Sequence, residues 1–178
     1  MQIPLMAHTA ATYILDAANN HLPGYAGLTQ GAAELIIHFA SKDLLETFVP
    51  NMLSGKWGGT MCLTEPQAGS SLSDIVTKAK PTQNGYYNIT GQKIFISGGD
   101  NQFAENIVHL VLARVEGAAK GTKGISLFIV PKNRNKSDGT LESNDVTTVA
   151  DFQKMGQKGY CTTHLGFGDK DDCKGWLV

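Results

Sequence analysis

The feature that most constrains the fold is a change of hydrophobic periodicity near residue 54. Before it, apolar side chains recur at the three- and four-residue spacing of helices. From about Gly55 onward, short apolar runs alternate with turn residues at close intervals. The pattern predicts an α+β chain: a partial helical domain over residues 1–54, followed by an antiparallel β-barrel or sandwich over residues 55–178.

Helix start and stop signals divide the first part into three helices. One is expected from Ile3-Pro4 to Asn20, with Pro23-Gly24 as the stop that follows it. A second is expected over Gly31 to Ala40. The third begins after Ser41, a plausible N-cap, and Pro50 is expected to break or restart it.

Turn residues and alternating runs place the strands. Asn84-Gly85 predicts a two-residue hairpin between Thr77–Thr82 and Tyr86–Thr90. The polar stretch Asn133 to Asn144 is expected to be an exposed loop. Further strands are expected over Lys93–Ser97, Ile107–Val115, Ile125–Val130, Val146–Met155 and Thr162–Phe167.

Composition excludes several classes of function. With 42% hydrophobic and 17% charged residues and a net charge of -1, the chain is globular and has no basic stripe for nucleic acid. The three cysteines form no CxxC pair, and the five histidines show no metal-ligand spacing. We therefore expect a cytoplasmic protein with no metal site, no signal peptide and no membrane span.

The run Met61-Cys-Leu-Thr-Glu-Pro-Gln-Ala-Gly-Ser70 is typical of a strand that stops abruptly at a turn of small residues. Thr64 and Ser97 are candidate hydroxyl donors at strand ends, and Phe95 is a candidate flat apolar support. Ala68-Gly69-Ser70 could hold a phosphate. A flavin needs all three kinds of group. Such residues are common at strand ends, so their chemistry alone favours a purely structural role.

Resemblance to a family changes that balance. The run Cys62 to Ser70 closely resembles the flavin-binding signature of the acyl-CoA dehydrogenase family. Gly91-Gln-Lys-Ile-Phe-Ile-Ser97 resembles the family's next signature, at a matching separation. Gly121 to Pro131 and Lys154-Met-Gly156 look like the strands that follow, so the resemblance spans essentially the whole chain.

Two further stretches indicate a subgroup. Asn106 to Arg114 and the region from Tyr25 to Gly31 look most like the subgroup that includes 3-methylmercaptopropionyl-CoA dehydrogenases.

The resemblance implies FAD contacts from particular residues. Thr64 would bond the pyrimidine side of the flavin, Phe95 would pack on the ring where many relatives carry Trp, and Ser97 would bond near N5 where many carry Thr. Ser70 would lie by the pyrophosphate and the CoA side of the substrate. The full set of implied cofactor contacts is Met61, Cys62, Leu63, Thr64, Gly69, Ser70, Phe95, Ile96 and Ser97.

Three further positions bear on the implied site. Relatives usually carry Asp where this chain has Ser71, and an Arg where it has Val76, so the local loop geometry is expected to differ. Glu65, beside the signature, invites the role of catalytic base. We favour the alternative that its carboxylate braces the turn by accepting backbone N–H bonds.

The resemblance implies α,β-dehydrogenation of an acyl-CoA thioester, with hydride transfer to FAD N5. The base of the family is a Glu in a C-terminal helical bundle, which this chain is expected to lack. We therefore expect no catalytic residue here, an inactive fragment and weak FAD binding. An electron-transfer flavoprotein is the implied acceptor, and the parent protein is expected to be a homo-oligomer.

Two alternatives stay open at this point. One is an acyl-CoA oxidase-type or nucleic-acid-associated relative on the same fold. The other is a non-enzymatic β-barrel binding module.

Overall fold

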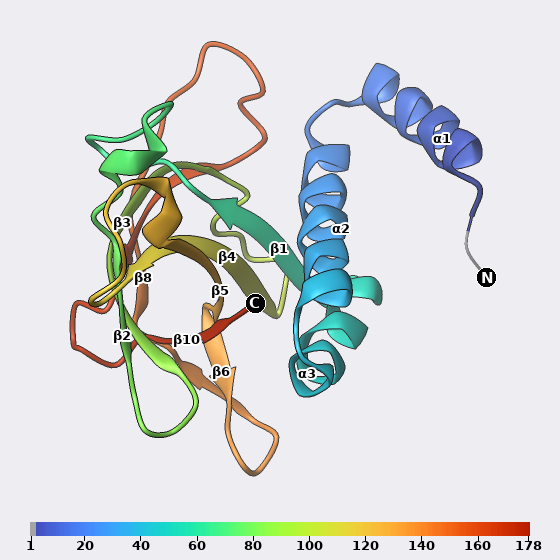
Figure 1. The fold of residues 1–178 in the computed structure, drawn as a ribbon. Helices are drawn as coiled ribbons and strands as arrows, with labels where there is room; N and C mark the ends of the chain where they lie inside the picture. Colours follow the sequence, from blue (N-terminus) through green and yellow to red (C-terminus); the bar gives the residue numbers. More distant parts are fainter. Residues whose placement is uncertain (1–2) are drawn as a thin grey trace.

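Three helices precede the strands: α1 (Leu5–Ala18), α2 (Leu22–Phe39) and α3 (Lys42–Leu53). The computed structural model describes residues 3–178. Figure 1 shows α2 and α3 lying beside the strands, whereas α1 extends away from them. Consistent with that position, no residue of α1 is buried.

Pro23 and Pro50 both lie inside helices. Pro23 occupies the first turn of α2, where a missing N–H costs nothing, so it starts this helix as well as following α1. The expectation that Pro50 breaks or restarts the third helix is wrong, because α3 continues through it to Leu53. Pro50 lies in the last turn, and its carbonyl still accepts the Ser54 N–H at 3.1 Å.

The strands follow in close succession and are β1 (Trp57–Cys62), β2 (Lys78–Pro81), β3 (Tyr87–Ser97), β4 (Asn106–Val115), β5 (Ile125–Pro131), β6 (Asn133–Asn135), β7 (Leu141–Ser143), β8 (Val146–Asp151), β9 (Thr162–Phe167) and β10 (Lys174–Leu177). The hairpin predicted at Asn84-Gly85 joins β2 to β3. Two strands expected separately merge into β3, and the polar stretch expected as a loop forms the β6–β7 hairpin.

The sheet closes on itself. β4, β5, β10 and β3 are neighbours in that order, and β2 pairs with both β3 and β4, which completes a ring. β1 extends the sheet beyond β4, and β9 and β8 extend it beyond β3. Most pairings are antiparallel, but β1–β4 and β2–β4 are parallel. The predicted α+β chain with a barrel is therefore confirmed.

Two apolar cores share the central strands. In β4, Val111 and Ala113 belong to the core inside the barrel, whereas Val108 and Leu110 belong to the core beneath the helices. Because successive side chains point to opposite faces, a strand covered on both faces is apolar throughout. This explains why the run predicted over 107–115 is so continuously hydrophobic.

The helices pack on β1 at close range. The Gly59 N–H donates to Thr29 Oγ1 of α2 at 3.0 Å, and a Cβ at Gly59 would lie 2.9 Å from Ala32 Cβ and Met52 Cε. The division into domains at residues 54 and 55 stays a prediction. Across residues 3–178, no helix combines the length and apolar character that crossing a membrane requires.

Candidate functional site

The first signature lies at the end of β1. The strand ends at Cys62, and reciprocal backbone hydrogen bonds of 2.8 and 3.1 Å between Glu65 and Ala68 close a tight turn. The turn returns the chain beside its own start, because a Cβ at Gly69 would lie 4.0 Å from Thr64 Cγ2. The prediction that a strand ends abruptly here and is followed by a turn of small residues is confirmed.

The second signature lies at an irregularity in β3. The register between β3 and β9 shifts between Lys93 and Ile96, and within this bulge Phe95 has φ of 58°. A positive φ is strained for a bulky residue, and such strain persists only where the surroundings enforce it. The Phe95 side chain is 57% exposed and contacts Phe152, so the bulge holds an aromatic ring at the surface.

The two signatures meet directly. The Ile94 N–H donates to Thr64 O at 2.9 Å, and Lys93 Nζ donates to Leu63 O at 3.0 Å. The segment after β1 therefore runs beside the bulge that carries Phe95. This contact places the segments that carry Thr64 and Ser97 on one part of the barrel. The two segments are about 30 residues apart in the chain, and the sequence alone did not indicate that they meet.

The residues predicted to contact the cofactor differ in their solvent exposure. Thr64 and Ser97 are half-buried, whereas Gly69 and Ser70 are exposed. Met61 is 37% exposed. Cys62 and Ile96 are buried in the barrel core, so their side chains cannot face a ligand. Burial raises the pKa of the Cys62 thiol to about 12, which keeps it protonated and unreactive.

Glu65 and Lys93 form a buried ion pair below the turn. Lys93 Nζ donates to Glu65 Oε1 at 2.8 Å, and the carboxylate also accepts the backbone N–H groups of Val76 at 2.8 Å and Thr77 at 3.1 Å. Burial acts to raise the pKa of Glu65, but these hydrogen bonds outweigh it and lower the pKa. The expectation that Glu65 braces the turn is confirmed.

Arg114 supports the loop in which Ser71 departs from the family pattern. Its Nη2 donates to Ser73 O at 3.0 Å, and its Nη1 donates to Ala119 O and Gly121 O. A cation from β4 therefore joins two loops through their carbonyl groups. We did not identify this role, because Arg114 follows an apolar run whose pattern indicates only a strand end.

An aromatic corner follows Ser97. Tyr25 of α2 contacts Tyr160 and Phe103 edge-on, at ring-centroid distances of 4.4 and 4.9 Å. A Cβ at Gly98 would lie 3.4 Å from Tyr25 Cδ1 and 3.5 Å from Tyr160 Oη. This corner, which sequence patterns did not predict, combines α2 with the loop before β9 and the loop after β3.

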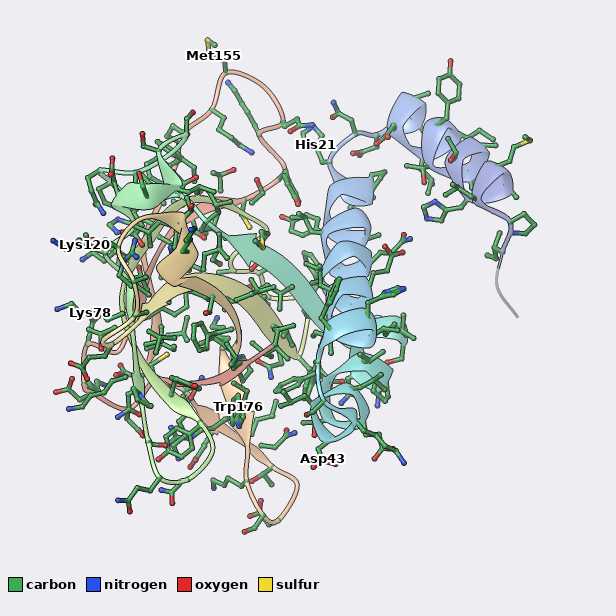
Figure 2. The ribbon with its side chains drawn as sticks, in the orientation of Figure 1. His21, Asp43, Lys78, Lys120, Met155 and Trp176 are labelled. Carbon is green, nitrogen blue, oxygen red and sulfur yellow. The ribbon has the colours of Figure 1, made fainter. Side chains whose placement is uncertain are left out.

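The loop between β8 and β9 is attached to the start of α2. The Gly159 N–H donates to His21 Nδ1 at 2.8 Å, and the Cys161 N–H donates to Tyr25 Oη at 3.0 Å. Figure 2 shows Met155 at the far tip of this loop, with His21 near its base.

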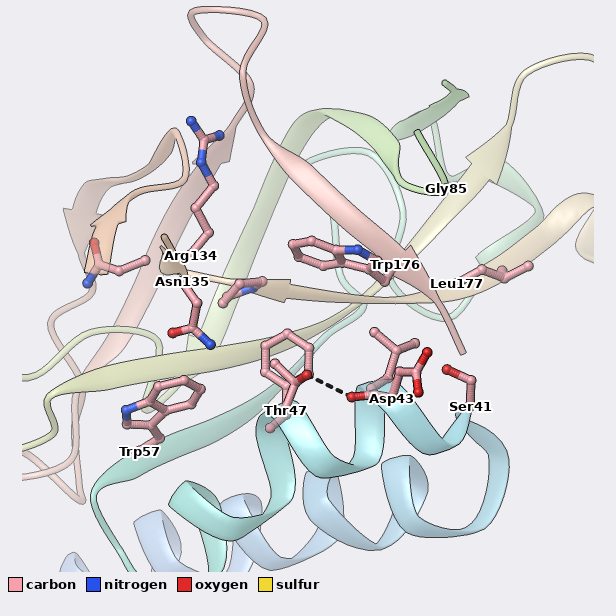
Figure 3. Close-up of a pocket in the computed structure, with 13 residues that line it drawn as sticks. Ser41, Asp43, Thr47, Trp57, Gly85, Arg134, Asn135, Trp176 and Leu177 are labelled. Atoms are coloured by element: carbon pink, nitrogen blue, oxygen red, sulfur yellow. Dashed lines mark hydrogen bonds between the residues drawn. The ribbon is translucent and has the colours of Figure 1, made fainter. Parts of the chain in front are cut away.

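A separate cavity of about 560 Å³ lies between α3 and the strands β5, β6 and β10. Figure 3 shows Trp57 and Trp176 on its walls, and Phe48 lies between them with ring centroids 6.3 and 6.0 Å away. No predicted cofactor contact lines this cavity. The cavity is therefore separate from the candidate site that the two signatures form.

Comparisons with known proteins agree with the resemblance. The family described as "Acyl-CoA dehydrogenase, middle domain" matches residues 60–169. A butyryl-CoA dehydrogenase of Syntrophomonas wolfei is 45% identical over 99% of this chain and 29% of that protein. A 3-methylmercaptopropionyl-CoA dehydrogenase of Ruegeria pomeroyi is 38% identical over 100% of this chain and 30% of that protein.

Solved structures show the same relationship. An acyl-CoA dehydrogenase from Bacillus anthracis, described as complexed with FAD, superposes with a TM-score of 0.62 and 26% identity, covering 84% of this chain and 24% of that chain. The chain thus spans only 29% and 30% of the length of the two curated relatives above. From the profile match, the identities and the shared barrel, it follows that this chain belongs to the acyl-CoA dehydrogenase family.

Proposed function

We propose that this chain supplies one wall of the FAD site in an enzyme that dehydrogenates acyl-CoA thioesters between the α and β carbons. The 2.9 Å hydrogen bond from Ile94 N to Thr64 O carries the proposal, because it holds the two flavin-type signatures side by side. Family membership supports the reaction class, and the B. anthracis relative described as complexed with FAD supports the cofactor.

The groups at the site fit a flavin. Phe95 offers a largely exposed ring held out of the core by a strained backbone. Thr64 and Ser97 offer half-buried hydroxyls on the two adjoining segments. Gly69 and Ser70 offer a small, exposed turn that a phosphate can approach closely. These are a flat support, polar donors and a phosphate-sized turn on one part of the surface.

We assign roles from this arrangement. Thr64 and Ser97 would donate hydrogen bonds to the polar edge of the cofactor, and Phe95 would support its ring. Ser70, with Gly69, would contact the pyrophosphate, and Ser70 would also contact the CoA side of the substrate. The backbone groups of Met61 and Leu63 would complete this wall, whereas Cys62 and Ile96 would support it from the barrel core. When bound, FAD would supply the acceptor for the hydride of the substrate.

Glu65 is not assigned the proton-abstracting role. Its side chain is 1% exposed, and its oxygens are occupied by Lys93, Val76 and Thr77. A base must reach the proton it removes, and a carboxylate held in this way cannot. We infer that a residue outside this chain removes the α proton, so the chain alone would not dehydrogenate a substrate.

The location, assembly and electron acceptor of the whole enzyme are part of the same proposal. We infer a cytoplasmic, homo-oligomeric parent enzyme that passes electrons to an electron-transfer flavoprotein. This part of the proposal rests on the resemblance to the acyl-CoA dehydrogenase family.

Titration with FAD tests the proposal. We expect saturable but weak binding, seen as induced visible circular dichroism of the flavin, and weaker binding of FMN, which lacks the adenosine and the second phosphate. No dehydrogenation of butyryl-CoA is expected from the chain alone. An absence of any FAD-dependent signal would refute the cofactor assignment, and copurification of one flavin per chain would contradict weak binding.

A further inference from the structure

Lys93 is an unusual residue to find in the interior of this barrel. Its side chain has no exposed surface, and lysine is almost never fully buried unless it is paired. The ammonium has two partners, Glu65 Oε1 at 2.8 Å and Leu63 O at 3.0 Å. One of these partners is a backbone carbonyl of the first flavin-type signature, which a simple charge pair would not require.

Two consecutive residues of β3 donate hydrogen bonds to two consecutive backbone carbonyl groups after β1. Lys93 binds Leu63 O through its side chain, and Ile94 binds Thr64 O through its backbone N–H. The pairing of β1 with β4 ends at Cys62. Residues 63 and 64 therefore no longer pair with β4, and their carbonyl groups bind β3 instead.

Glu65 extends this attachment to a third segment. Its carboxylate accepts the N–H groups of Val76 and Thr77, which precede β2, and the amide of Gln67 within the turn. The Lys93 end of the pair lies where the register of β3 begins to shift toward Phe95. One ion pair thus connects the turn, the entry to β2 and the bulge.

We propose that Lys93, together with Glu65, is a positioning residue that aligns the Leu63–Thr64 segment with the Phe95 bulge and so assembles the FAD-facing wall. This inference rests on the proposed function. Because both side chains are buried, the pair would not touch the cofactor itself. It acts through the carbonyl of Leu63 and through the backbone that carries Thr64 and Phe95.

A merely stabilising pair makes a different prediction. Removing one partner leaves a buried charge unpaired and lowers stability, whereas neutralising both partners often restores much of it. If the pair only stabilises, the double variant Lys93→Met/Glu65→Gln should recover FAD binding along with stability. If the pair positions the wall, FAD binding should stay impaired, because Leu63 O has lost its donor.

The experiment compares the wild-type chain with Lys93→Met, the double variant and a control, Arg134→Gln. Arg134 pairs with Glu142 and Asp172 at the cavity of Figure 3, so its loss disturbs an ion pair away from the signatures. Each protein is titrated with FAD, and its melting temperature is recorded. Amide hydrogen exchange of Ile94 is measured against Leu110, a buried residue of β4.

We expect the double variant to bind FAD at least tenfold more weakly, with about tenfold faster exchange at Ile94 relative to Leu110. Arg134→Gln should leave both unchanged even if it melts earlier. The inference is overturned if the double variant keeps wild-type FAD affinity, or if FAD binding weakens while Ile94 exchange stays the same. Should the wild-type chain fail to bind FAD, the proposed function fails, while Ile94 exchange still decides whether the pair aligns the segments.

Discussion

The rings of Phe95 and Phe152 lie 4.6 Å apart between centroids, at an interplanar angle of 42°. Phe95 reaches this position with φ of 58°, a conformation that phenylalanine rarely adopts. The contact therefore holds a strained, exposed ring in place before any ligand arrives. Strain maintained at a surface is characteristic of binding sites, where it preorganises a contact.

Replacing Phe95 tests the role of this ring. Phe95→Ala keeps the strained backbone but removes the flat support, and an aromatic pair contributes roughly 0.5–1.5 kcal/mol. We expect FAD affinity to fall roughly three- to tenfold, and Phe95→Trp to retain it. Phe39→Ala, at another exposed phenylalanine, is the control. Equal losses in both alanine variants, measured by flavin circular dichroism, would contradict the assignment.

Neighbouring glycines of β1 should respond differently to the same substitution. A Cβ at Gly59 would lie 2.9 Å from Ala32 and Met52, whereas a Cβ at Gly58 would lie 3.7 Å from Ile107 Cγ1. Gly59→Ala should therefore destabilise the chain by about 1–3 kcal/mol through overpacking between sheet and helices. Gly58→Ala should be neutral or slightly stabilising. Urea unfolding of both variants checks this, and similar midpoints would refute it.

Stability should depend on pH through His109. Burial, with a smaller effect of Lys132, lowers the pKa of His109 to about 3. In the unfolded chain histidine titrates near 6.5, so below that pH the unfolded state binds a proton that the native state excludes. Stability should therefore fall as pH drops from about 6.5 toward 3, by about 1.4 kcal/mol per unit once the unfolded histidine is protonated.

A paired substitution isolates this effect. The His109 Nδ1 atom is hydrogen-bonded to Thr60 Oγ1 at 2.7 Å, so His109→Leu is combined with Thr60→Val to leave no unpaired hydroxyl. Urea midpoints are measured from pH 7 to pH 5, above the range in which carboxylates titrate. The double variant should lose the slope that the wild type shows, and an unchanged slope would exclude His109 as its source.

The loop between β8 and β9 should loosen when its attachment to α2 is removed. Tyr25→Phe deletes the acceptor of the Cys161 N–H at a cost of about 1 kcal/mol. We expect faster tryptic cleavage in this loop, which contains Lys154 and Lys158. Tyr13→Phe, at a tyrosine that is 75% exposed, should leave the cleavage rate unchanged. Identical rates in the wild type and Tyr25→Phe would show that the hydrogen bond does not restrain the loop.

Periodicity predicted most of the fold, and the places that it misread have physical causes. The strands expected over Tyr86–Thr90 and Lys93–Ser97 leave Gly91 between them, yet β3 passes through it. A Cβ there would lie 2.5 Å from Thr77 Oγ1, so the glycine permits a close approach of two segments and marks no end. The β6–β7 hairpin was not predicted because its strands pair only with each other and bury little surface. Their sequence is therefore as polar as that of a loop.

The candidate site was predicted in its residues and not in its geometry. Resemblance identified Thr64, Phe95 and Ser97, but the positive φ of Phe95 arises from a register shift that depends on β9. Lys93 received no role because a buried ammonium looks like any exposed lysine in a sequence. Its partners, Leu63 O and the Glu65 carboxylate, come within reach only when the chain folds.

The closed ring of strands has a kinetic consequence. β10 lies between β5 and β3, so Lys174–Leu177 must insert between strands formed from much earlier sequence before the ring is complete. Contacts between such distant segments incur loop-closure entropy before they contribute stability, which slows folding. The rate-limiting event for this barrel is therefore expected to be the capture of its final strand, and slow refolding should end with the burial of Cys173 beside it.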